Sequence, residues 1–370
     1  MHQIPLARPD ITQREIDAVV TVLKTPQLSL GPRVEEFERV FANYCGTRHA
    51  VAISSGTAGL HLLVRAMGIG HGDEVITTPF SFVASSNCAL FEGARPVFVD
   101  IDPDTWNIDP RHIESAVTPR TKAIIPVDVF GQIADMDPIL EIARRHDLWV
   151  LEDSCEALGA RYKGHIAGSI GDAGVFGFYP NKQITTGEGG MIVTNNGELA
   201  DLCHSMRNQG RDTGGGWLAH PRLGYNFRLS DINCALGIAQ MERITEILAA
   251  RTRVADLYRH RLEGEPRVRM QKIPPHVEMS WFVMVVKLDE RYTQADRDRI
   301  LVRLRERGIG CSNYFVPIHL QKFYVEQFGY QPGDFPICES VAARTIALPF
   351  HAGLTESDAN TVCSELAALL

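Results

Sequence analysis

The period of the hydrophobic pattern changes along the chain. Near the N-terminus apolar residues recur every three or four positions, which predicts helices over Thr12 to Lys24 and Arg33 to Tyr44. Thr12 and Glu15 have capping-box spacing, and Pro26 ends the first helix. Further along, short apolar runs alternate with helical segments. This alternation predicts an α/β fold with a mostly parallel sheet flanked by helices on both faces.

Short apolar runs bounded by turn residues mark the strands of this sheet. The runs are residues 49–54, 74–78, 96–100, 122–127, 148–151, 174–178 and 191–193. Helices are expected after Ser55, from Pro79 onward and over 138–146. Ligands of such sheets bind at the carboxyl ends of the strands, so residues that follow a strand are candidates for one common site. Those residues are Ser55, Phe82, Asp128, Asp153 and Lys182.

A smaller second domain is expected toward the C-terminus, where the pattern changes. Its elements are one long helix over 230–258 that a break could divide, strands over 268–273 and 281–288, a helix over 293–307, a strand from Gly308 to Phe315 and a final helix over 357–370. We therefore predict a large domain over residues 1–240 and a small α+β domain over 241–370.

Composition narrows the class of protein. The 370 residues are 45% hydrophobic, enough for more than one domain, and the formal net charge of −8 gives no reason to expect nucleic acid or an anionic membrane surface as a partner. The eight cysteines show no metal-binding spacing, and we see neither a secretory signal nor an apolar run of ~20 residues. We expect a cytoplasmic protein with reduced thiols and no metal site. Arginines such as Arg251 are expected on solvated helix faces.

The stretch Gly174 to Met191 holds the leading candidate for chemistry. Lys182 follows a predicted buried strand and Pro180, and a glycine-rich turn at 187–190 comes soon after. An apolar pocket favours the neutral lysine amine, which is the form that condenses with an aldehyde. A lysine on an exposed turn explains this stretch alone equally well.

Three further positions indicate what Lys182 could act with. Ser55-Gly56-Thr57 lies between a strand and a helix, where amides and hydroxyls suit a phosphate, although a plain helix cap is the commoner role. Asp153 could hold a pyridinium nitrogen and Phe82 could stack on the ring; a helix cap and a core residue are the alternatives. No GxGxxG or P-loop motif indicates a nucleotide cofactor. Together these groups fit pyridoxal 5′-phosphate (PLP).

Five motifs follow one another in a characteristic order. They are SSGTAGLH at 54–61, TPFSF at 78–82, EDSCEA at 152–157, the stretch through Lys182, and GYNFRLSD at 224–231. In this order they resemble the DegT/DnrJ/EryC1/StrS family of sugar aminotransferases, from about Ile4 to the C-terminus. The resemblance implies a fold-type I PLP-dependent transferase, with a seven-stranded sheet in the large domain.

The resemblance also implies catalytic roles. Lys182 would form the Schiff base with PLP and later move the proton between cofactor and sugar carbon. Asp153 would pair with the pyridine nitrogen, and Phe82 would cover the ring.

The phosphate of PLP would be held by Ser55, Gly56 and Thr57. In the family, the residue at Asn226 reaches the phosphate in the other subunit, which implies a homodimer with shared active sites.

Substrate contacts are implied less sharply. Arg228 is a candidate for binding the carboxylate of the amino donor, expected to be L-glutamate. The loop 208–220 and the segment from Tyr314 to His319 are expected to contact the acceptor.

Three positions depart from the commonest residues of the family. Glu156 stands where Gln near the cofactor's O3′ is common, so we expect a proton shared between two oxygens; some members that make perosamine-type sugars resemble the chain here. Gly177 lacks the hydroxyl of a frequent serine, which removes one phosphate ligand. Asp128 stands in place of a frequent histidine.

The expected reaction is a ping-pong transfer from glutamate to a nucleotide-linked 4-keto-6-deoxyhexose or its 3-keto isomer. A keto-cyclitol acceptor of the scyllo-inosose type is an alternative that no residue excludes. A PLP-dependent sugar dehydratase is disfavoured, because members with that activity tend to have His where Lys182 stands. A non-enzymatic PLP-binding regulator is disfavoured by the lack of a DNA-binding helix pair and of a basic patch.

Overall fold

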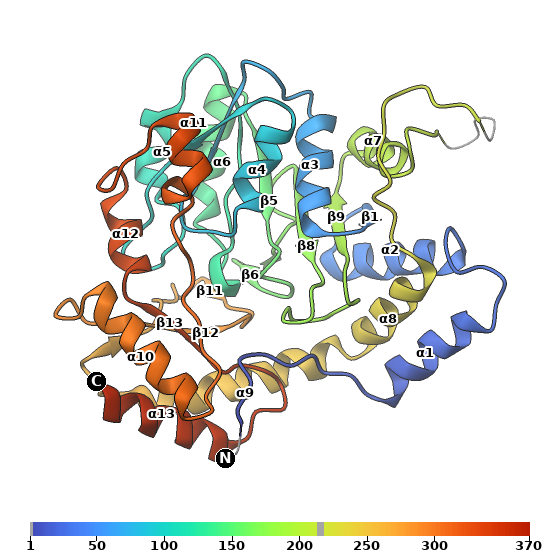
Figure 1. Ribbon diagram of the computed structural model, residues 1–370. Coiled ribbons are helices and arrows are strands. Elements are labelled where there is room, and N and C mark those ends of the chain that lie inside the picture. The colour runs from blue at the N-terminus through green and yellow to red at the C-terminus, as the bar shows by residue number, and fades with distance from the viewer. Residues whose placement is uncertain (1–2, 213–217) are drawn as a thin grey trace.

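A seven-stranded sheet forms the centre of the larger part of the molecule in the computed structural model, which describes residues 3–212 and 218–370 (Figure 1). Its strands are β1 (His49–Ile53), β2 (Glu74–Thr77), β3 (Arg95–Phe98), β4 (Thr121–Ile124), β5 (Trp149–Asp153), β8 (Ala173–Gly177) and β9 (Gly190–Thr194). Their order is β1-β9-β8-β5-β4-β2-β3, and only β9 runs antiparallel to its neighbours. The predicted mostly parallel sheet is confirmed.

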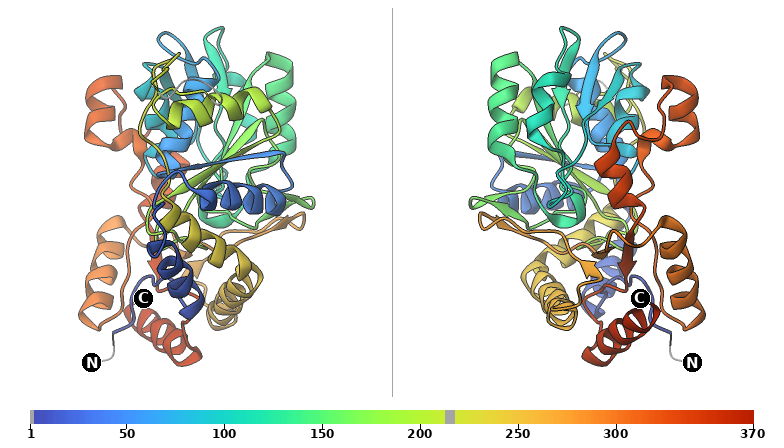
Figure 2. Two further views of the ribbon diagram at one scale, coloured as in Figure 1. Left: turned by 90° about the vertical axis from the view of Figure 1, so that its right-hand side faces the viewer. Right: turned by 90° about the vertical axis from the view of Figure 1, so that its left-hand side faces the viewer.

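Helices cover both faces of this sheet (Figure 2). They are α2 (Pro32–Cys45), α3 (Gly56–Ala66), α4 (Ala84–Phe91), α5 (Pro110–Ala116), α6 (Met136–His146), α7 (Gly197–Arg207) and α8 (Asp231–Glu242), whereas α1 (Gln13–Leu23) packs against α8. Alternation along β1 separates two cores: Val51 and Ile53 pack with α3, α4 and α7, whereas Ala50 and Ala52 pack with α2 and α8. A third core lies between the sheet and α5 and α6.

The C-terminal part is built on a second, antiparallel sheet of order β10-β12-β13. Its elements are α9 (Ile244–Leu262), β10 (Val268–Arg269), β12 (Met284–Leu288), α10 (Gln294–Glu306), α11 (Lys322–Phe328), α12 (Pro336–Ala342), β13 (Thr345–Leu348) and α13 (Glu356–Leu369). Helices α9, α10 and α13 share one apolar core with this sheet. A division at position 240 stays a prediction.

A minor sheet and two short 3-10 turns complete the described elements. The minor sheet joins β6 (Arg161–Tyr162), β7 (His165–Ile166) and β11 (Val277–Glu278), and the turns are η1 (Val129–Gly131) and η2 (Ile318–Leu320). β11 belongs to the C-terminal part and pairs with β6, so this sheet ties the two parts together.

Two sequence predictions are wrong in detail. The strand expected up to Phe315 does not form, because the segment makes only isolated bridges at Ile309 and Ser312. The strand expected over 268–273 is reduced to β10. The predicted long helix is divided at Arg243, which joins α8 to α9. No described helix has both the length and the apolar character of a membrane span.

Candidate active site

Lys182 lies in the loop between β8 and β9, at the carboxyl edge of the sheet. Its Nζ is 3.4 Å from Glu156 Oε1 and 3.9 Å from the centre of the Phe282 ring. The side chain is only 16% exposed. A lysine on an exposed turn is therefore excluded, and the amine faces a carboxylate on one side and an aromatic ring on another.

Glu156 is buried in the loop that follows β5. Its Oε2 accepts a hydrogen bond of 2.9 Å from the backbone N–H of Phe130, while Oε1 faces Lys182. Burial raises the pKa of Glu156, and the positive charge of Lys182 opposes this shift. Glu156 can therefore hold a proton directly beside the lysine amine.

Asp153 ends β5 and is also buried. Its Oδ2 accepts a hydrogen bond of 2.7 Å from the hydroxyl of Ser85 on α4, and its Oδ1 accepts a longer one, 3.3 Å, from the N–H of Cys155. Sequence reasoning missed Ser85, which lies 68 positions from its partner. Ser85 holds one oxygen of the carboxylate in place and leaves capacity on the other for a cationic ring nitrogen.

The predicted phosphate cradle is the N-terminus of α3. The Ser55 hydroxyl caps the helix by accepting from the N–H of Ala58 at 3.1 Å. The amides of Gly56 and Thr57 open the helix, where no intrahelical acceptor exists. A Cβ on Gly56 would lie 2.6 Å from Cys155 Sγ, so the close approach requires glycine. Ser55 therefore caps the helix, and the phosphate-binding role of this segment stays a prediction.

The Cys155 thiol connects this cradle with the charged groups. Burial raises the pKa of Cys155, the negative charges of Asp153 and Glu156 raise it further, and the positive charge of Lys182 opposes them. Gly56 on one side and the charged groups of Asp153, Glu156 and Lys182 on the other therefore surround the Cys155 thiol.

Two positions that depart from the family pattern, Gly177 and Asp128, have different surroundings. Gly177, at the end of β8, lies beside Cys155 with room for a Cβ at ordinary contact distance, 3.6 Å. Asp128 is fully buried and accepts from the hydroxyl of Ser154 at 2.7 Å and from the N–H of Ala134 at 3.2 Å. Burial raises the pKa of Asp128 well above its usual range, and the charge of Glu152 adds to the shift.

The other predicted site residues with rings are Phe82, Tyr314 and His319. Phe82 precedes α4 in a turn and is 64% exposed, so its ring is available to cover a ligand. Tyr314 lies close enough to Glu156 that this charge, with burial, raises the pKa of its hydroxyl. His319 is fully buried, with Nε2 3.0 Å from Glu339 Oε1, and its contact with substrate stays a prediction.

Asn226 and Arg228 follow the loop whose residues 213–217 lie outside the described residues. Asn226 is exposed and forms an isolated bridge with Asn208, and Arg228 donates to the side chain of Asn208 at 3.0 Å. Phe227 accepts from the N–H of Ser54, which holds this segment beside the end of β1. These five residues belong to the predicted substrate loop 208–220, whose contact with the acceptor stays a prediction.

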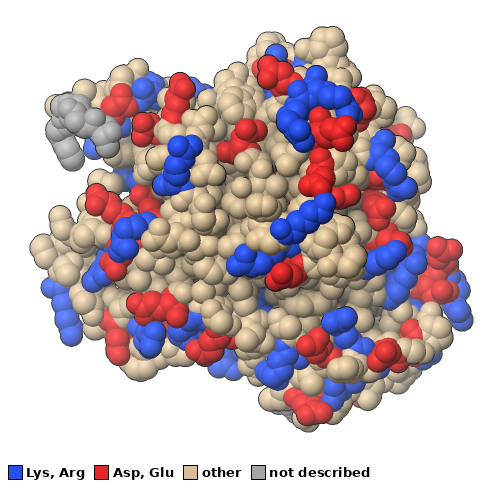
Figure 3. All heavy atoms as spheres, turned by 180° about the vertical axis from the view of Figure 1, so that it is seen from behind, with Lys and Arg blue, Asp and Glu red and all other residues tan. Residues whose placement is uncertain are grey.

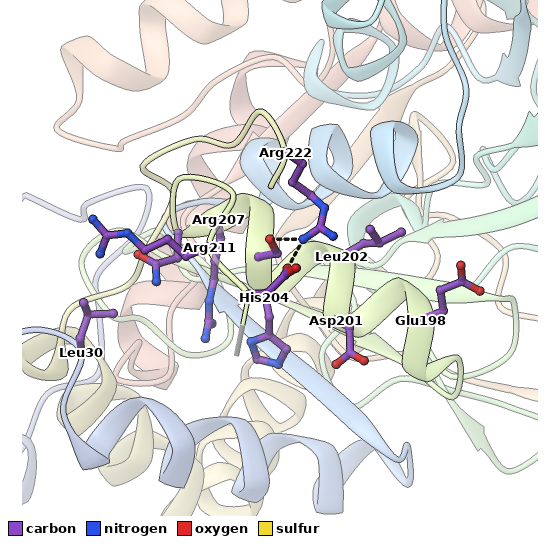
Figure 4. Close-up of a pocket in the computed structure, with 11 residues that line it drawn as sticks. Leu30, Glu198, Asp201, Leu202, His204, Arg207, Arg211 and Arg222 are labelled. Carbon is purple, nitrogen blue, oxygen red and sulfur yellow. Dashed lines mark hydrogen bonds and ion pairs between the residues drawn. The ribbon is translucent and has the colours of Figure 1, made fainter. Parts of the chain in front are cut away.

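A cavity lies elsewhere in the molecule (Figure 4). Its volume is about 620 Å³, and its walls come from α7, from the loop after it and from Leu30. It shares no residue with the group around Lys182. His204 points into it, and burial lowers the pKa of this histidine to about 4.

The possible partners of charged side chains can be narrowed by two observations. Among residues 3–212 and 218–370 no cluster of His, Cys, Asp or Glu is placed to bind a metal ion. Side chains of both charges are interspersed over the face in Figure 3.

Comparison with known proteins identifies the family. The model of the DegT/DnrJ/EryC1/StrS aminotransferase family matches residues 9–367. The chain belongs to this family. It is 43% identical to GDP-perosamine synthase from Caulobacter vibrioides over 375 residues, covering 100% of this chain and 99% of that protein.

Solved structures of the family have the same fold. PseC from Helicobacter pylori, an aminotransferase involved in the biosynthesis of pseudoaminic acid, superposes with a TM-score of 0.94 at 29% identity, over 100% of this chain and 99% of that one. The PLP form of Spr1654 from Streptococcus pneumoniae, described as a sugar aminotransferase, also gives 0.94 at 29% identity, over 100% of both chains. The protein is a PLP-dependent sugar aminotransferase of fold-type I, as the motifs predict.

The residues present fit PLP. A buried lysine, a buried carboxylate with a free acceptor position, and the free amides of a helix start are the partners that an aldehyde, a pyridinium nitrogen and a phosphate require. Gly56 lies so close to Cys155 that a side chain at position 56 would collide with the Cys155 thiol. The cradle can form here only because residue 56 is glycine. When bound, PLP supplies the electron sink for the reaction.

Proposed function

We propose that the protein transfers an amino group from L-glutamate to a nucleotide-linked 4-keto-6-deoxyhexose or its 3-keto isomer, in two half-reactions at one site. The observation that carries this proposal is the buried Lys182 amine between Glu156 and Phe282, at the same sheet edge as Asp153 and the start of α3. The relative named GDP-perosamine synthase supports a GDP-linked acceptor.

We assign the proton movements to two neighbouring side chains. Lys182 Nζ is the base that takes and returns a proton at the reacting carbon. Glu156 Oε1, 3.4 Å from Nζ, holds a proton beside it, and its hydrogen bond from Phe130 keeps the carboxyl oriented. Both side chains are largely shielded from solvent, with exposures of 16% and 10%, which limits the access of water to this proton.

We assign binding to groups at the edge of the same site. Asp153, held by Ser85, receives the pyridine nitrogen, the amides of Gly56 and Thr57 receive the phosphate, and the exposed ring of Phe82 covers the cofactor. Tyr314 and Arg228 line the approach for acceptor and donor: Tyr314 lies near Glu156, and Arg228 is fixed by Asn208.

We propose a homodimer in which Asn226 completes the phosphate site of the partner subunit. In the described part of the chain the Asn226 amide has no hydrogen-bond partner, and the residue is exposed. Large apolar side chains near it in sequence or in space are also exposed: Leu218 by 78%, Leu223 by 68% and Phe91 by 53%. A second copy would cover such side chains.

The experiment that tests the activity follows the colour of the bound cofactor. Glutamate should discharge the yellow colour of the PLP-loaded protein, and only the correct keto sugar should restore it. The panel contains GDP-, dTDP- and UDP-linked keto-deoxysugars and a keto-cyclitol, with Lys182→Ala as the inactive control. A colour that glutamate leaves unchanged would contradict the donor, and restoration by the cyclitol alone would replace the nucleotide-sugar acceptor.

A further inference from the structure

Arg251 on α9 is buried, contrary to the expectation of a solvated helix face. It is 4% exposed, and it forms no ion pair within the described residues; the negative charge of Asp10 acts on it only from beyond ion-pair distance. Its Nε donates to the carbonyl of Trp281 at 2.8 Å, and its Nη2 donates to the carbonyl of Phe282 at 2.7 Å. A buried cation without an anionic partner is costly, so such an arrangement calls for a reason.

The third contact of this guanidinium leads to the active-site lysine. Nη2 also lies 3.4 Å from the carbonyl of Asn181, the residue directly before Lys182. One guanidinium thus joins the backbone beneath Lys182 to the backbone of Phe282, whose ring centre is 3.9 Å from Lys182 Nζ. In Figure 1, α9 passes below the loop that joins β8 and β9.

The segment around Phe282 is fixed on its other side as well. The N–H of Ser280 donates to the carbonyl of Gly131 at 2.9 Å, and the side chain of Gln183 donates to the carbonyl of Ser280 at 3.0 Å. A Cβ on Gly131 would lie 1.8 Å from the Ser280 oxygen, so the two backbones touch. Both neighbours of Lys182 in sequence, Asn181 and Gln183, are therefore bound to the 280–282 segment or to the arginine that holds it.

We propose that Arg251 is a positioning residue for the reaction, and that it sets where Lys182 Nζ stands by holding the Asn181 carbonyl and the Phe282 ring in one fixed relation. Burial lowers the pKa of Arg251 to about 10, so the side chain stays charged near neutral pH. The planar guanidinium reaches three carbonyls in a fork that the single ammonium of lysine cannot reproduce. The inference rests on the proposed role of Lys182 as the residue that binds PLP.

The test measures where PLP is attached, in addition to activity. PLP-loaded protein is reduced with borohydride, and mass spectrometry gives the fraction of bound PLP fixed to Lys182, over a range of neutral to alkaline pH. Arg251→Lys should lower this fraction about 10-fold near neutral pH and shift its pH profile. The reason is that a misplacement of a reacting group by about 1 Å costs up to about 100-fold in the rate of its reaction. The KM for glutamate should change far less than kcat.

Arg297→Lys is the matched control. Arg297 on α10 is also buried, at 3% exposure, and also donates to two backbone carbonyls, those of Ala342 and Thr345; unlike Arg251 it pairs with a carboxylate, Asp298, and it has no contact with the lysine loop. It should lose thermal stability like Arg251→Lys yet label Lys182 as the unmodified protein does. Phe282→Leu removes the ring under Nζ and leaves Arg251 intact, and it should reproduce the labelling defect. If Arg251→Lys does not fold, normal labelling of Phe282→Leu would overturn the proposal that the ring positions Lys182 Nζ.

The outcomes separate the two proposals. If the unmodified protein is not labelled at Lys182, the proposed function and this inference both fail. If it is labelled, and Arg251→Lys and Phe282→Leu are labelled like Arg297→Lys, only the positioning role of Arg251 is overturned.

Discussion

Single residues at this site derive their chemistry from their immediate neighbours. Lys182 is a common side chain on a loop, but burial, the Glu156 carboxyl and the Phe282 ring together restrict where its amine stands and what it can exchange protons with. Ser85 does the same for Asp153 by holding one of its oxygens. Changes of one functional group should therefore have large effects here.

Replacement of Lys182 by alanine should abolish turnover and spare cofactor binding. Activity should fall by at least ~10³-fold, because both covalent attachment and proton transfer are lost. PLP should still bind non-covalently through the start of α3 and Asp153, as equilibrium dialysis would show. Lys163→Ala, at an exposed lysine paired with Asp137, serves as the control. Full activity of purified Lys182→Ala would contradict the assigned role.

Asp128 should make stability depend on pH in a defined direction. Its pKa is raised in the folded protein above the usual 3.8, so the folded state favours the protonated carboxyl. This stabilisation is present below pH 3.8 and is lost as pH rises through the raised pKa. Relative to Asp128→Asn, the unmodified protein should lose about 1.4 kcal/mol per pH unit over that window.

Urea unfolding of both proteins at a series of pH values measures this difference. Asp137→Asn, at an exposed carboxyl whose pKa Lys163 lowers, should show no such slope above its usual titration range. Parallel stability curves for the unmodified protein and Asp128→Asn would contradict the prediction.

The residues predicted from sequence are those that follow strands or carry family motifs. Lys182, Asp153 and Gly56 were accessible in this way, because parallel strands bring their carboxyl ends to one edge. Ser85, Phe282 and Arg251 were not, since they reach the site from elements far away in sequence. For Arg251 the pattern of the helix predicts an exposed side chain. Its burial depends on carbonyls of other segments, which the sequence of its own helix does not indicate.

At the scale of elements, the N-terminal helix is tied to the junction of α8 and α9 by one buried ion pair. Glu15 belongs to the capping box of α1, and its Oε1 accepts from Arg243 Nη1 at 2.8 Å. Burial raises the pKa of Glu15, but hydrogen bonds from Thr12 and Arg243 outweigh it and lower the pKa to about 2. Arg243 is also the residue at which the predicted long helix breaks.

Glu15→Gln should destabilise the protein at neutral pH by roughly 3 kcal/mol, because it leaves Arg243 without its buried partner. The lowered pKa means that this stabilisation is present above pH 4.5 and is lost as pH falls toward 2. The difference between the two proteins in urea unfolding should therefore shrink over that interval.

Glu246→Gln is the control for the same arginine. Glu246 lies 3.0 Å from Arg243 but its side chain is 69% exposed and screened by solvent, so its loss should destabilise the protein far less than the loss of Glu15. Equal destabilisation by the two substitutions would contradict the prediction that the buried Glu15 stabilises the protein more than the exposed Glu246.

Element prediction succeeded where the pattern was local. The strands of the large sheet and the capping box of Thr12 and Glu15 were recognised, because their apolar runs and cap residues lie within a few positions. The strand expected after Gly308 failed, because that segment meets its neighbours only at Ile309 and Ser312. The helix expected from Pro79 begins only at Ala84, since the preceding turn leaves Phe82 exposed.

At the scale of the whole molecule, the proposed dimer determines whose residues complete each site. Asn226 is exposed in a single chain, whereas Lys182 is buried at its own sheet edge. If Asn226 binds the phosphate in the partner subunit, each active site contains residues of both chains. Exchange of subunits between two inactive variants can distinguish this from a site within one chain.

Mixing Lys182→Ala with Asn226→Ala subunits should restore activity. In a hybrid dimer one of the two sites combines an intact Lys182 with an intact Asn226 from the other chain, so an equal mixture should recover about a quarter of the sites. Activity is measured after subunit exchange, with each variant alone as the control. No recovery in a mixture shown to contain hybrids would place Asn226 in the site of its own chain.

The antiparallel strand β9 has a consequence for how fast the lysine loop can open. β8 and β9 pair from Ala173 opposite Thr194 to Gly177 opposite Gly190, in the interior of the sheet, so both ends of the loop that carries Lys182 are closed by the same ladder. Opening the loop from its base would break central strands rather than a free edge. Amide protons of β8 and β9 should thus exchange with solvent among the slowest in the chain, and the catalytic amine should keep its place while substrates come and go.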